Sequence, residues 1–254
     1  MTFGQESEYY SPYFQFKKGT IKQSYGDNVK LREAANLTSK TISLLKINDS
    51  VKILGVTEDT LSFDGVTSNW YEVSYNGKKG FVLGALLSLH SFTRNKNTFL
   101  FQLSNKNDQL WLKVRVLNGT DFKEYSFNLI GKEFSLGLTN GRGLKNIENI
   151  IAVNYISEAC GVEGGVSYLL WNGNILSKLA DLSRIVDADQ YSFDEKFIFP
   201  DDANGISNKI KYELEIEHLE DESTNWRISK KQEREYTWDG EKLLPNFEHN
   251  KKEE

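Results

Sequence analysis

The sequence predicts an all-β protein, and three features of the chain lead to this prediction. Aromatic or β-branched residues alternate with polar ones in many short segments, for example over residues 71–75. Turn-forming pairs such as Asn76-Gly77 separate these segments, and such pairs accept the positive φ angles of tight hairpins. Helical patterns are scarce. Residues 176–185 carry leucines near helical spacing, but the Gly173-Asn174 turn before them competes with a helix.

Composition limits the classes of protein that fit this chain of 254 residues, a length typical of one large or two small domains. With 39% hydrophobic and 13% aromatic residues, the chain can bury a core. The net charge of -5 argues against a nucleic-acid partner, which needs a concentrated excess of Lys and Arg. The apolar runs are too short for a transmembrane segment, the single Cys160 permits no internal disulfide, and we predict no cofactor.

We expect residues 1–27 to form an N-terminal lead-in. Residues 1–6 resemble the end of a secretory leader, which predicts an exported, extracytoplasmic protein, periplasmic or secreted. The aromatic residues between positions 9 and 16 predict a packed segment rather than a mobile tail. Pro12 restricts this segment to an edge strand or an irregular conformation.

The best-defined region of the sequence is residues 28–89, which ends in a hairpin around Asn76-Gly77. Its motifs occur in a fixed order: Leu31-Arg32, Val51-Lys52-Ile53-Leu54, Trp70-Tyr71-Glu72-Val73, Asn76-Gly77 and Gly80-Phe81-Val82. This order and spacing resemble the bacterial SH3-like domain. Two departures from the family pattern are the absence of Gly and Pro after Arg32 and a long loop between Leu54 and Trp70, which contains Asp64 and Gly65.

The resemblance implies a small β-barrel and a binding role, because SH3-like folds bind extended peptides on aromatic-lined grooves. Strand alternation places Tyr71 and Val73 on the core face and Trp70 on the opposite face, where Phe81 also lies. We therefore predict ligand-binding residues Arg32, Trp70 and Phe81. The alternative is that Trp70 closes one end of the barrel. The implied partner is a peptide, a cell-wall fragment or another protein.

The remaining chain is predicted to be a polar linker at residues 91–96 and an antiparallel β domain at residues 97–247, followed by a disordered tail at 248–254. Hairpins are expected where residues 98–103 meet 109–116 and where residues 122–130 meet 133–138. The architecture predicted from these elements is an SH3-like barrel followed by an antiparallel β-meander, as an open sheet or a sandwich.

Two similar segments within this domain indicate an internal repeat. Residues 168–176 and 236–244 share an aromatic residue, a tryptophan, an Asn-Gly or Asp-Gly turn and an apolar exit strand. Each segment follows a predicted long strand, at residues 150–160 and 209–219. Such hairpins are propeller-like, but two copies cannot close a propeller. We expect Trp171 and Trp238 to pack in the core rather than to form a ligand platform.

One possible function of the chain is that of a cell-wall-processing cysteine hydrolase with a catalytic C-terminal domain. Cys160 is the candidate nucleophile of such an enzyme. A cysteine peptidase needs a histidine within hydrogen-bonding reach of the thiolate, and His218 is the best placed of the three histidines. Nothing after Cys160 reads as the helix on which such enzymes place their cysteine. The residue is better explained as a small buried side chain at the end of a strand.

Two groups of acidic residues are further candidate sites. Residues 200–205 place Asp201 and Asp202 before Gly205, but their spacing differs from that of calcium loops and an ordinary turn explains them. Glu213, Glu215 and Glu217 share one face of a period-two strand, where a solvated face is simpler than paired catalytic carboxylates.

Taken together, these features favour a non-enzymatic, exported bacterial binding or scaffold protein whose SH3-like module recognises its partner. The hydrolase above is the alternative. A structural component of a larger assembly is a third class, which would show a large apolar patch on the C-terminal sheet.

Overall fold

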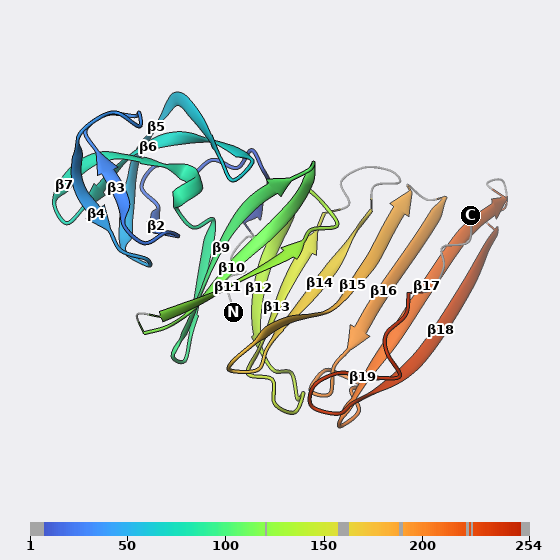
Figure 1. Cartoon of the computed structure of the whole chain (residues 1–254). Coiled ribbons are helices and arrows are strands. Elements are labelled where there is room, and N and C mark those ends of the chain that lie inside the picture. Colours follow the sequence, from blue (N-terminus) through green and yellow to red (C-terminus); the bar gives the residue numbers. More distant parts are fainter. Residues whose placement is uncertain are drawn as a thin grey trace, which may run out of the picture. The chain divides into compact units, whose positions relative to one another are not determined.

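The computed structural model describes residues 8–119, 121–156, 163–187, 190–221, 224 and 226–249. These residues form an all-β structure with one 3₁₀ turn, η1 (Gly84–Leu86), which confirms the predicted fold class (Figure 1). The chain divides into two compact units. The N-terminal unit is Tyr10–Lys132, and the C-terminal unit comprises Met1–Tyr9 and Glu133–Glu254.

The first sheet of the N-terminal unit is six-stranded and antiparallel, with the order β2-β5-β6-β7-β3-β4. The predicted Asn76-Gly77 hairpin is confirmed, because β6 pairs with β7 and both turn residues have positive φ. Residues 1–27 are not purely a lead-in, since β2 pairs with β5. The strands are β2 (Ile21–Gln23), β3 (Val29–Arg32), β4 (Thr41–Leu45), β5 (Ser50–Phe63), β6 (Val66–Tyr75) and β7 (Lys78–Leu83).

The core of this sheet follows the alternation read from the sequence. Tyr71 and Val73 are buried on the same face of β6, as predicted, and Leu31 and Val82 are fully buried as well. Gly80 lies where β7 passes β3, and a Cβ there would come within 2.6 Å of the Arg32 carbonyl oxygen. The Gly-Phe-Val motif therefore begins with glycine because the two backbones approach closely.

The second sheet of the N-terminal unit is four-stranded, with the order β11-β10-β9-β8. The predicted β9–β10 hairpin is confirmed. The predicted linker at residues 91–96 is wrong, because most of it lies in β8, which pairs with β9. The strands are β8 (His90–Arg94), β9 (Asn97–Lys106), β10 (Gln109–Asn118) and β11 (Asp121–Asn128).

The expected hairpin between residues 122–130 and 133–138 is also wrong. Residues 121–128 form β11 and pair with β10, across a turn in which Gly119 has a φ of 68°. Residues 134–140 form β12, which belongs to a different sheet. The hairpin therefore forms around the shorter connection at Gly119 and not around Gly131. Residues 97–132 belong to the N-terminal unit rather than to a domain spanning 97–247.

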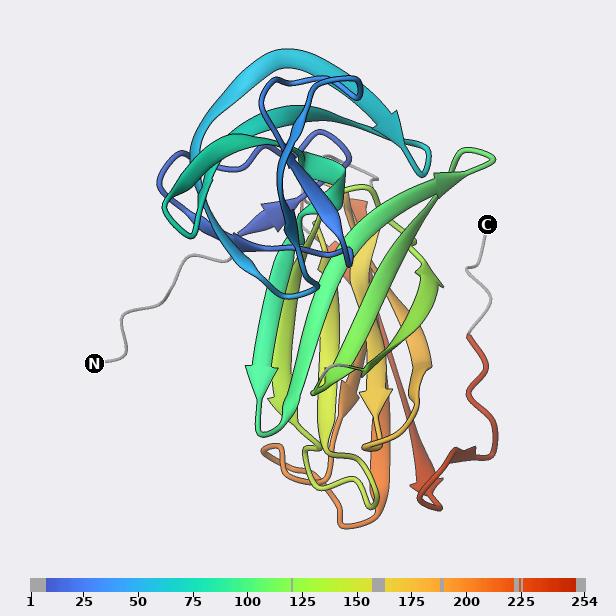
Figure 2. The same ribbon diagram turned by 60° about the vertical axis from the view of Figure 1, so that its left-hand side comes forward.

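The region predicted as a long loop between Leu54 and Trp70 is instead an extension of the β5–β6 hairpin (Figure 2). Asp64 and Gly65 form its tip, both with positive φ. The tip docks on β9 and β10, where the Asn105 amide donates to the Asp64 carbonyl at 3.0 Å and Lys113 Nζ lies 2.8 Å from Asp64 Oδ2. The hairpin thus ties the two sheets of this unit together.

A second link between the two sheets is built from Tyr25, Arg115 and Glu124. The Arg115 guanidinium lies 4.4 Å from the centroid of the Tyr25 ring, and its Nε is 2.7 Å from Glu124 Oε2. The Tyr25 hydroxyl donates to the same carboxylate at 3.2 Å. Burial, and then the Glu124 charge, raise the pKa of Tyr25, so its phenol stays protonated and remains a donor.

Glu124 should make the stability of the N-terminal unit sensitive to acid. Burial pushes the pKa of this carboxyl group upward, but the hydrogen bond and charge of Arg115, with Lys113, leave it below its ordinary 4.5. A lowered folded-state pKa stabilises the fold above the ordinary value, and that contribution is lost as the pH falls through the folded value. We expect urea midpoints of Glu124→Gln to decline less steeply than wild type between about pH 5 and pH 3.

An identical pH slope in the two proteins would contradict this role of Glu124. The matched control is Glu33→Gln, because Glu33 is exposed and its contact with Lys40 is a loose surface pair at 3.6 Å. This control should leave the slope unchanged.

The C-terminal unit contains one long antiparallel sheet with the order β1-β12-β13-β14-β15-β16-β17-β18-β19. The strands β12 to β18 run side by side in Figure 1. The predicted meander is confirmed as an open sheet, and residues 176–185 lie in a strand. The strands are β1 (Tyr9–Tyr10), β12 (Phe134–Asn140), β13 (Asn149–Tyr155), β14 (Gly164–Trp171), β15 (Leu176–Asp187), β16 (Tyr191–Ile198), β17 (Lys209–Asp221), β18 (Trp226–Trp238) and β19 (Leu243–Leu244).

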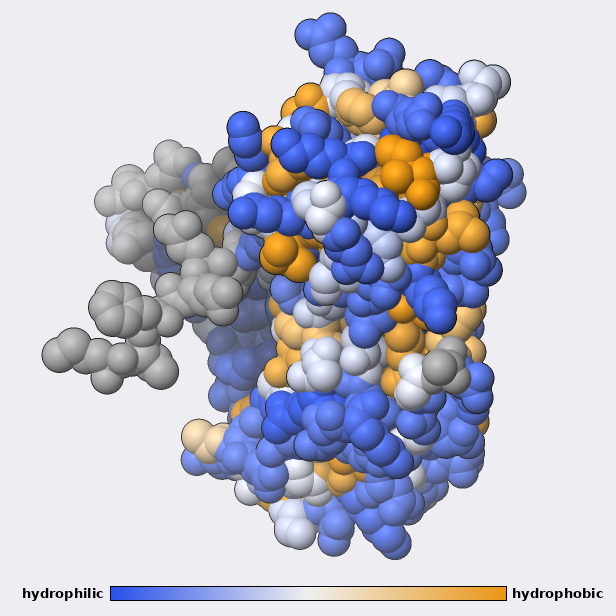
Figure 3. Space-filling view, turned by 90° about the vertical axis from the view of Figure 1, so that its left-hand side faces the viewer, coloured by the Kyte–Doolittle hydropathy of each residue, from blue (hydrophilic) through white to orange (hydrophobic). Residues whose placement is uncertain are grey.

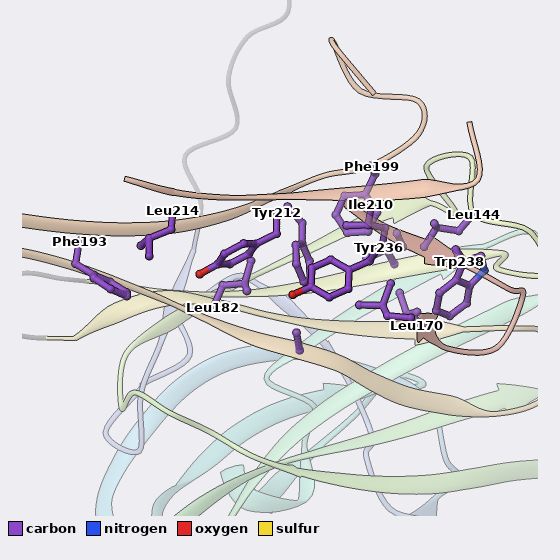
Figure 4. Packing of buried hydrophobic residues seen from close by; sticks show 14 residues of the cluster. Leu144, Leu170, Leu182, Phe193, Phe199, Ile210, Tyr212, Leu214, Tyr236 and Trp238 are labelled. Atoms are coloured by element: carbon purple, nitrogen blue, oxygen red, sulfur yellow. The ribbon is translucent and has the colours of Figure 1, made fainter. Parts of the chain in front are cut away.

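One face of this sheet carries a core of large apolar side chains (Figure 4). Residues at alternate positions of β17 project into it, because side chains in a strand alternate between the two faces. The labelled members include Leu182, Phe193, Phe199, Ile210, Tyr212, Leu214, Tyr236 and Trp238.

The two similar segments have the same local geometry, as the repeat predicts. Asn172 Oδ1 accepts from the amides of residues 174 and 175, and Asp239 Oδ1 accepts from those of residues 241 and 242. Gly173 and Gly240 follow with positive φ. Trp171 and Trp238 are each 4% exposed, so their predicted core packing is confirmed.

The expectation of a solvated glutamate face on β17 is wrong for Glu213, which is 7% exposed. The register places Lys196 of β16 directly beside it, with Nζ 2.9 Å from the carboxylate. The hydrogen bond from Lys196 lowers the pKa of Glu213. Glu213 is buried because lysines of the neighbouring strands cover this face with their long side chains. The sequence of β17 alone does not reveal these lysines.

Candidate functional site

The three predicted ligand-binding residues lie close together, but Trp70 is not on the surface. It is 4% exposed and forms a small cluster with Leu83 and Ala85, against which Phe81 and Leu61 pack. Trp70 does lie on the face of β6 opposite Val73, as alternation requires. That face is covered by the extended hairpin, through Leu61, and by the segment after β3, through Ala35. The expectation of an exposed Trp70 is therefore corrected.

Arg32 and Phe81 are half-buried neighbours. They are register partners between β3 and β7, and Arg32 Nη1 donates to the Ser39 carbonyl at 2.9 Å. This bond holds the segment between β3 and β4 against the barrel. A direct contact of either residue with a ligand stays a prediction.

A pocket of about 430 Å³ opens elsewhere on the same unit. One wall is the irregular segment between β1 and β2, residues 11–16. The opposite walls are the start of β6, the η1 turn and the ends of β9 and β10. Its lining residues are Ser11, Pro12, Tyr13, Phe14, Gln15, Phe16, Thr60, Gly65, Val66, Thr67, Ser68, Asn69, Tyr71, Gly84, Ala85, Leu89, Gln102, Leu103, Asn105 and Leu110. We call it the Tyr71 pocket.

The aromatic wall of the Tyr71 pocket is fixed in place by contacts within the unit. Phe16 packs against Tyr71 with ring centroids 5.0 Å apart, and its amide donates to the Tyr71 hydroxyl at 3.1 Å. The buried Lys22 ammonium lies 4.9 Å from the Phe16 centroid and 5.6 Å from that of Phe14. Lys22 Nζ also donates to the Leu89 carbonyl at 2.8 Å, so one cation connects both walls.

The polar groups of the Tyr71 pocket are amides and hydroxyls. Asn69 Nδ2 donates to the Thr57 carbonyl at 2.9 Å, and Gln15 Nε2 donates to Asn69 Oδ1 at 3.3 Å. Burial raises the pKa of Tyr71, which keeps the phenol neutral. None of the described residues that line the pocket carries a charge. The site suits an uncharged group with an apolar part and amide hydrogen-bonding atoms.

The aromatic segment at residues 9–16 was predicted to pack, and its role as a pocket wall was missed. The sequence signal was present in Pro12-Tyr13-Phe14, which places rings and a rigid bend before a strand. The opposite wall could not be found from local patterns, because it depends on the docking of the β5–β6 tip on β9.

The hydrophobic residues on the face shown in Figure 3 form small separate patches between hydrophilic ones. Exposed apolar side chains of the N-terminal unit, such as Leu37 and Leu44, are likewise spread over different elements. Scattered single residues of this kind are normal on a protein surface. A concave pocket is therefore a better candidate site on this unit than a broad apolar surface.

Among the described residues, those of the other predicted sites do not line the Tyr71 pocket. Cys160 and the leader-like residues 1–6 lie outside the described residues. His218 lies on β17 and packs edge-on against Tyr191. Within residues 200–205, the Asp202 carboxylate is engaged by Arg142 and by the Phe199 amide at 2.8 Å, as in an ordinary turn. The described part of the chain contains no cluster of three His, Cys, Asp or Glu side chains suited to a metal ion.

The tail predicted at residues 248–254 is described only as far as His249, which packs against Phe247 with ring centroids 5.0 Å apart. Among the described residues, no helix is both long and apolar enough to cross a membrane.

The six-stranded sheet with its pocket defines a small β-barrel module of the kind that binds other molecules. Residues 27–88 match the model of the bacterial SH3 domain family, which confirms the resemblance seen at residues 28–89. Comparison of the chain with curated proteins and with solved structures gave no match. A bacterial SH3 domain indicates a binding module, and such domains are often extracellular or associated with the cell wall.

Proposed function

We propose that this chain is a non-enzymatic, extracytoplasmic binding protein that holds an extended peptide segment in the Tyr71 pocket. The segment belongs to a cell-wall fragment or to a partner protein. The observation that carries the proposal is the pocket itself, which combines aromatic walls with neutral amide groups in about 430 Å³. Ligand pockets of ~300–1,000 Å³ with a few placed polar groups are typical of specific binding sites.

The chemistry of the lining favours a neutral, partly apolar ligand. A charged ligand group buried here would leave water without meeting an opposite charge on the described lining, which is costly. An apolar side chain would instead gain contact with Phe14, Phe16 and Tyr71, and peptide amides can pair with the carboxamides of Gln15 and Asn69. An extended peptide supplies both kinds of group.

The pocket is larger than the SH3 domain alone could build. Residues 11–16 and the β9–β10 wall lie outside residues 27–88, which match the family. Flanking segments thus supply half of the proposed site. Ligand choice should therefore depend on the aromatic segment before the domain as much as on the domain itself.

Two substitutions at the mouth of the pocket test the proposal. Thr67→Trp places a large ring at an exposed lining position of β6, where an aromatic residue suits a strand. Tyr13→Ala removes a lining ring that is 88% exposed. We expect each variant to bind purified peptidoglycan, or the best peptide from an array, at least about tenfold more weakly, which corresponds to roughly 1.4 kcal/mol. The added ring of Thr67→Trp obstructs the pocket, and Tyr13→Ala removes an aromatic contact with the ligand.

The matched control is Leu37→Ala, since Leu37 is 59% exposed on the same unit and does not line the pocket. Co-sedimentation and fluorescence anisotropy report binding, and thermal melts verify that each variant is folded. Wild-type affinity in a folded Thr67→Trp variant would reject the pocket as the site. Absence of wild-type binding to both peptidoglycan and the peptide array would reject the function.

A further inference from the structure

A second site with ligand-binding chemistry lies in the C-terminal unit, on the core face of the long sheet. Phe197 of β16, Tyr212 of β17 and Tyr236 of β18 surround the ring of Phe247, with centroid distances of 5.1, 5.5 and 5.7 Å. Tyr212 and Tyr236 project from neighbouring strands on the same face (Figure 4). We call these three residues the aromatic cage.

A buried carboxyl group stands at one end of the aromatic cage. Glu195 of β16 shares the apolar face with Phe197 and is 4% exposed. The Tyr212 hydroxyl donates to its Oε1 at 2.7 Å, and the Ser183 amide donates to its Oε2 at 2.8 Å. The imidazole Nδ1 of His249 lies 3.6 Å from Oε2. The ring of Phe247 thus lies in the aromatic cage, and the imidazole of His249, two residues later in the chain, lies beside the Glu195 carboxyl group.

Most residues of the segment that fills this site are exposed to solvent. Residues 245–249 lie outside any strand, and Pro245, Asn246, Glu248 and His249 are exposed while Phe247 is half-buried. Arg234 Nη1 donates a long hydrogen bond, 3.5 Å, from the sheet to the Glu248 carbonyl oxygen of this segment. An exposed segment that places a ring and an imidazole against the site resembles a bound ligand more than a structural strand.

We propose that the aromatic cage and Glu195 form a peptide-binding site that residues 247–249 occupy in cis. The ligand is a peptide with an aromatic residue followed two positions later by a basic residue. This site lies in the C-terminal unit and does not depend on the function proposed for the Tyr71 pocket. Residues 247–249 compete with an added peptide for the site at an effective concentration of about millimolar, because they are part of the same chain. The intact chain therefore binds such a peptide weakly.

The test uses the full-length chain with Phe247→Ala, which empties the cage without touching its walls. The probe is a fluorescent peptide with the sequence of residues 243–249, carrying Lys in place of the final His. Anisotropy should show at least tenfold tighter binding to Phe247→Ala than to wild type. A second peptide with Ala for Phe should lose binding, and a third with Gln for the final Lys should bind at least fivefold more weakly.

Peptide variants keep the test independent of whether changes at Glu195 are tolerated by the fold. Circular dichroism establishes that Phe247→Ala is folded. Absence of binding to this folded variant, or equal binding of all three peptides, would overturn the proposal. So would a wild-type dimer that Phe247→Ala dissociates in light scattering, because the cage would then serve a second copy of the chain.

Discussion

Gly65→Ala should reduce the free energy of unfolding of the N-terminal unit by about 3 kcal/mol, the combined cost of a left-handed alanine and a lost docking contact. Gly65 has a φ of +76°, and a Cβ atom there would stand 2.0 Å from the Asn105 carbonyl oxygen. The close contact is with the backbone of Asn105, so no rotation of a side chain can relieve it. The hairpin tip must lift, which breaks the Asn105 to Asp64 hydrogen bond and separates Asp64 from Lys113.

Gly77→Ala is the matched control for this substitution. Gly77 has nearly the same φ, +75°, but a Cβ there would meet no atom within 4 Å. Its cost should be about 1 kcal/mol, from the backbone conformation alone. Urea unfolding followed by tryptophan fluorescence measures both variants. Equal costs would show that the docking of the tip contributes little.

The same substitution connects stability to the proposed function. Residues 65–69 line the Tyr71 pocket, so lifting the tip should also widen the pocket and weaken binding. Gly77 does not line it, so Gly77→Ala should bind as wild type does. The contrast separates a site that needs the docked hairpin from one formed by the barrel alone.

The parts of this structure that follow from short-range chemistry could be predicted from the sequence. Asn76-Gly77 forms the hairpin that its tolerance of positive φ requires, and Tyr71 and Val73 share the buried face. The Asn172 and Asp239 turns are equally local, because each side chain caps amides two and three residues ahead.

What could not be predicted depends on partners far away in the chain. Asp64 and Gly65 look like a loop in the sequence, because their contact with Asn105 joins residues far apart in the chain. Glu213 looks solvated until Lys196 of the neighbouring strand is placed beside it. The Tyr71 pocket could not be predicted for the same reason, since its walls come from three distant segments: residues 11–16, β6 and β9.

The strand face on which a side chain lies does not determine whether it is exposed, as Trp70 shows. Alternation correctly assigned Trp70 to the face opposite Val73. The prediction that Trp70 is exposed is wrong, because Ala35, Leu61 and Leu86 pack against the small cluster that Trp70 forms there. The extended β5 strand covers this face through Leu61.

Trp70→Ala should therefore act mainly on stability, with a loss of about 3–5 kcal/mol as expected for truncating a buried aromatic side chain. Trp70 is 4% exposed, and its removal leaves a cavity bounded by Leu83 and Ala85. Phe81→Ala should cost less, because Phe81 is only half-buried. Differential scanning calorimetry of both variants measures this order.

Binding measurements on Trp70→Phe distinguish a structural role from ligand contact. Phenylalanine keeps most of the buried volume, so the barrel should stay folded and bind peptidoglycan or peptide within about twofold of wild type, since a buried ring that touches no ligand contributes no differential binding energy. Thr67→Trp should weaken the same binding at least about tenfold at native stability. A tenfold loss in Trp70→Phe with unchanged melting would return Trp70 to the ligand surface and move the proposed site from the Tyr71 pocket to the Arg32 and Phe81 side of the barrel.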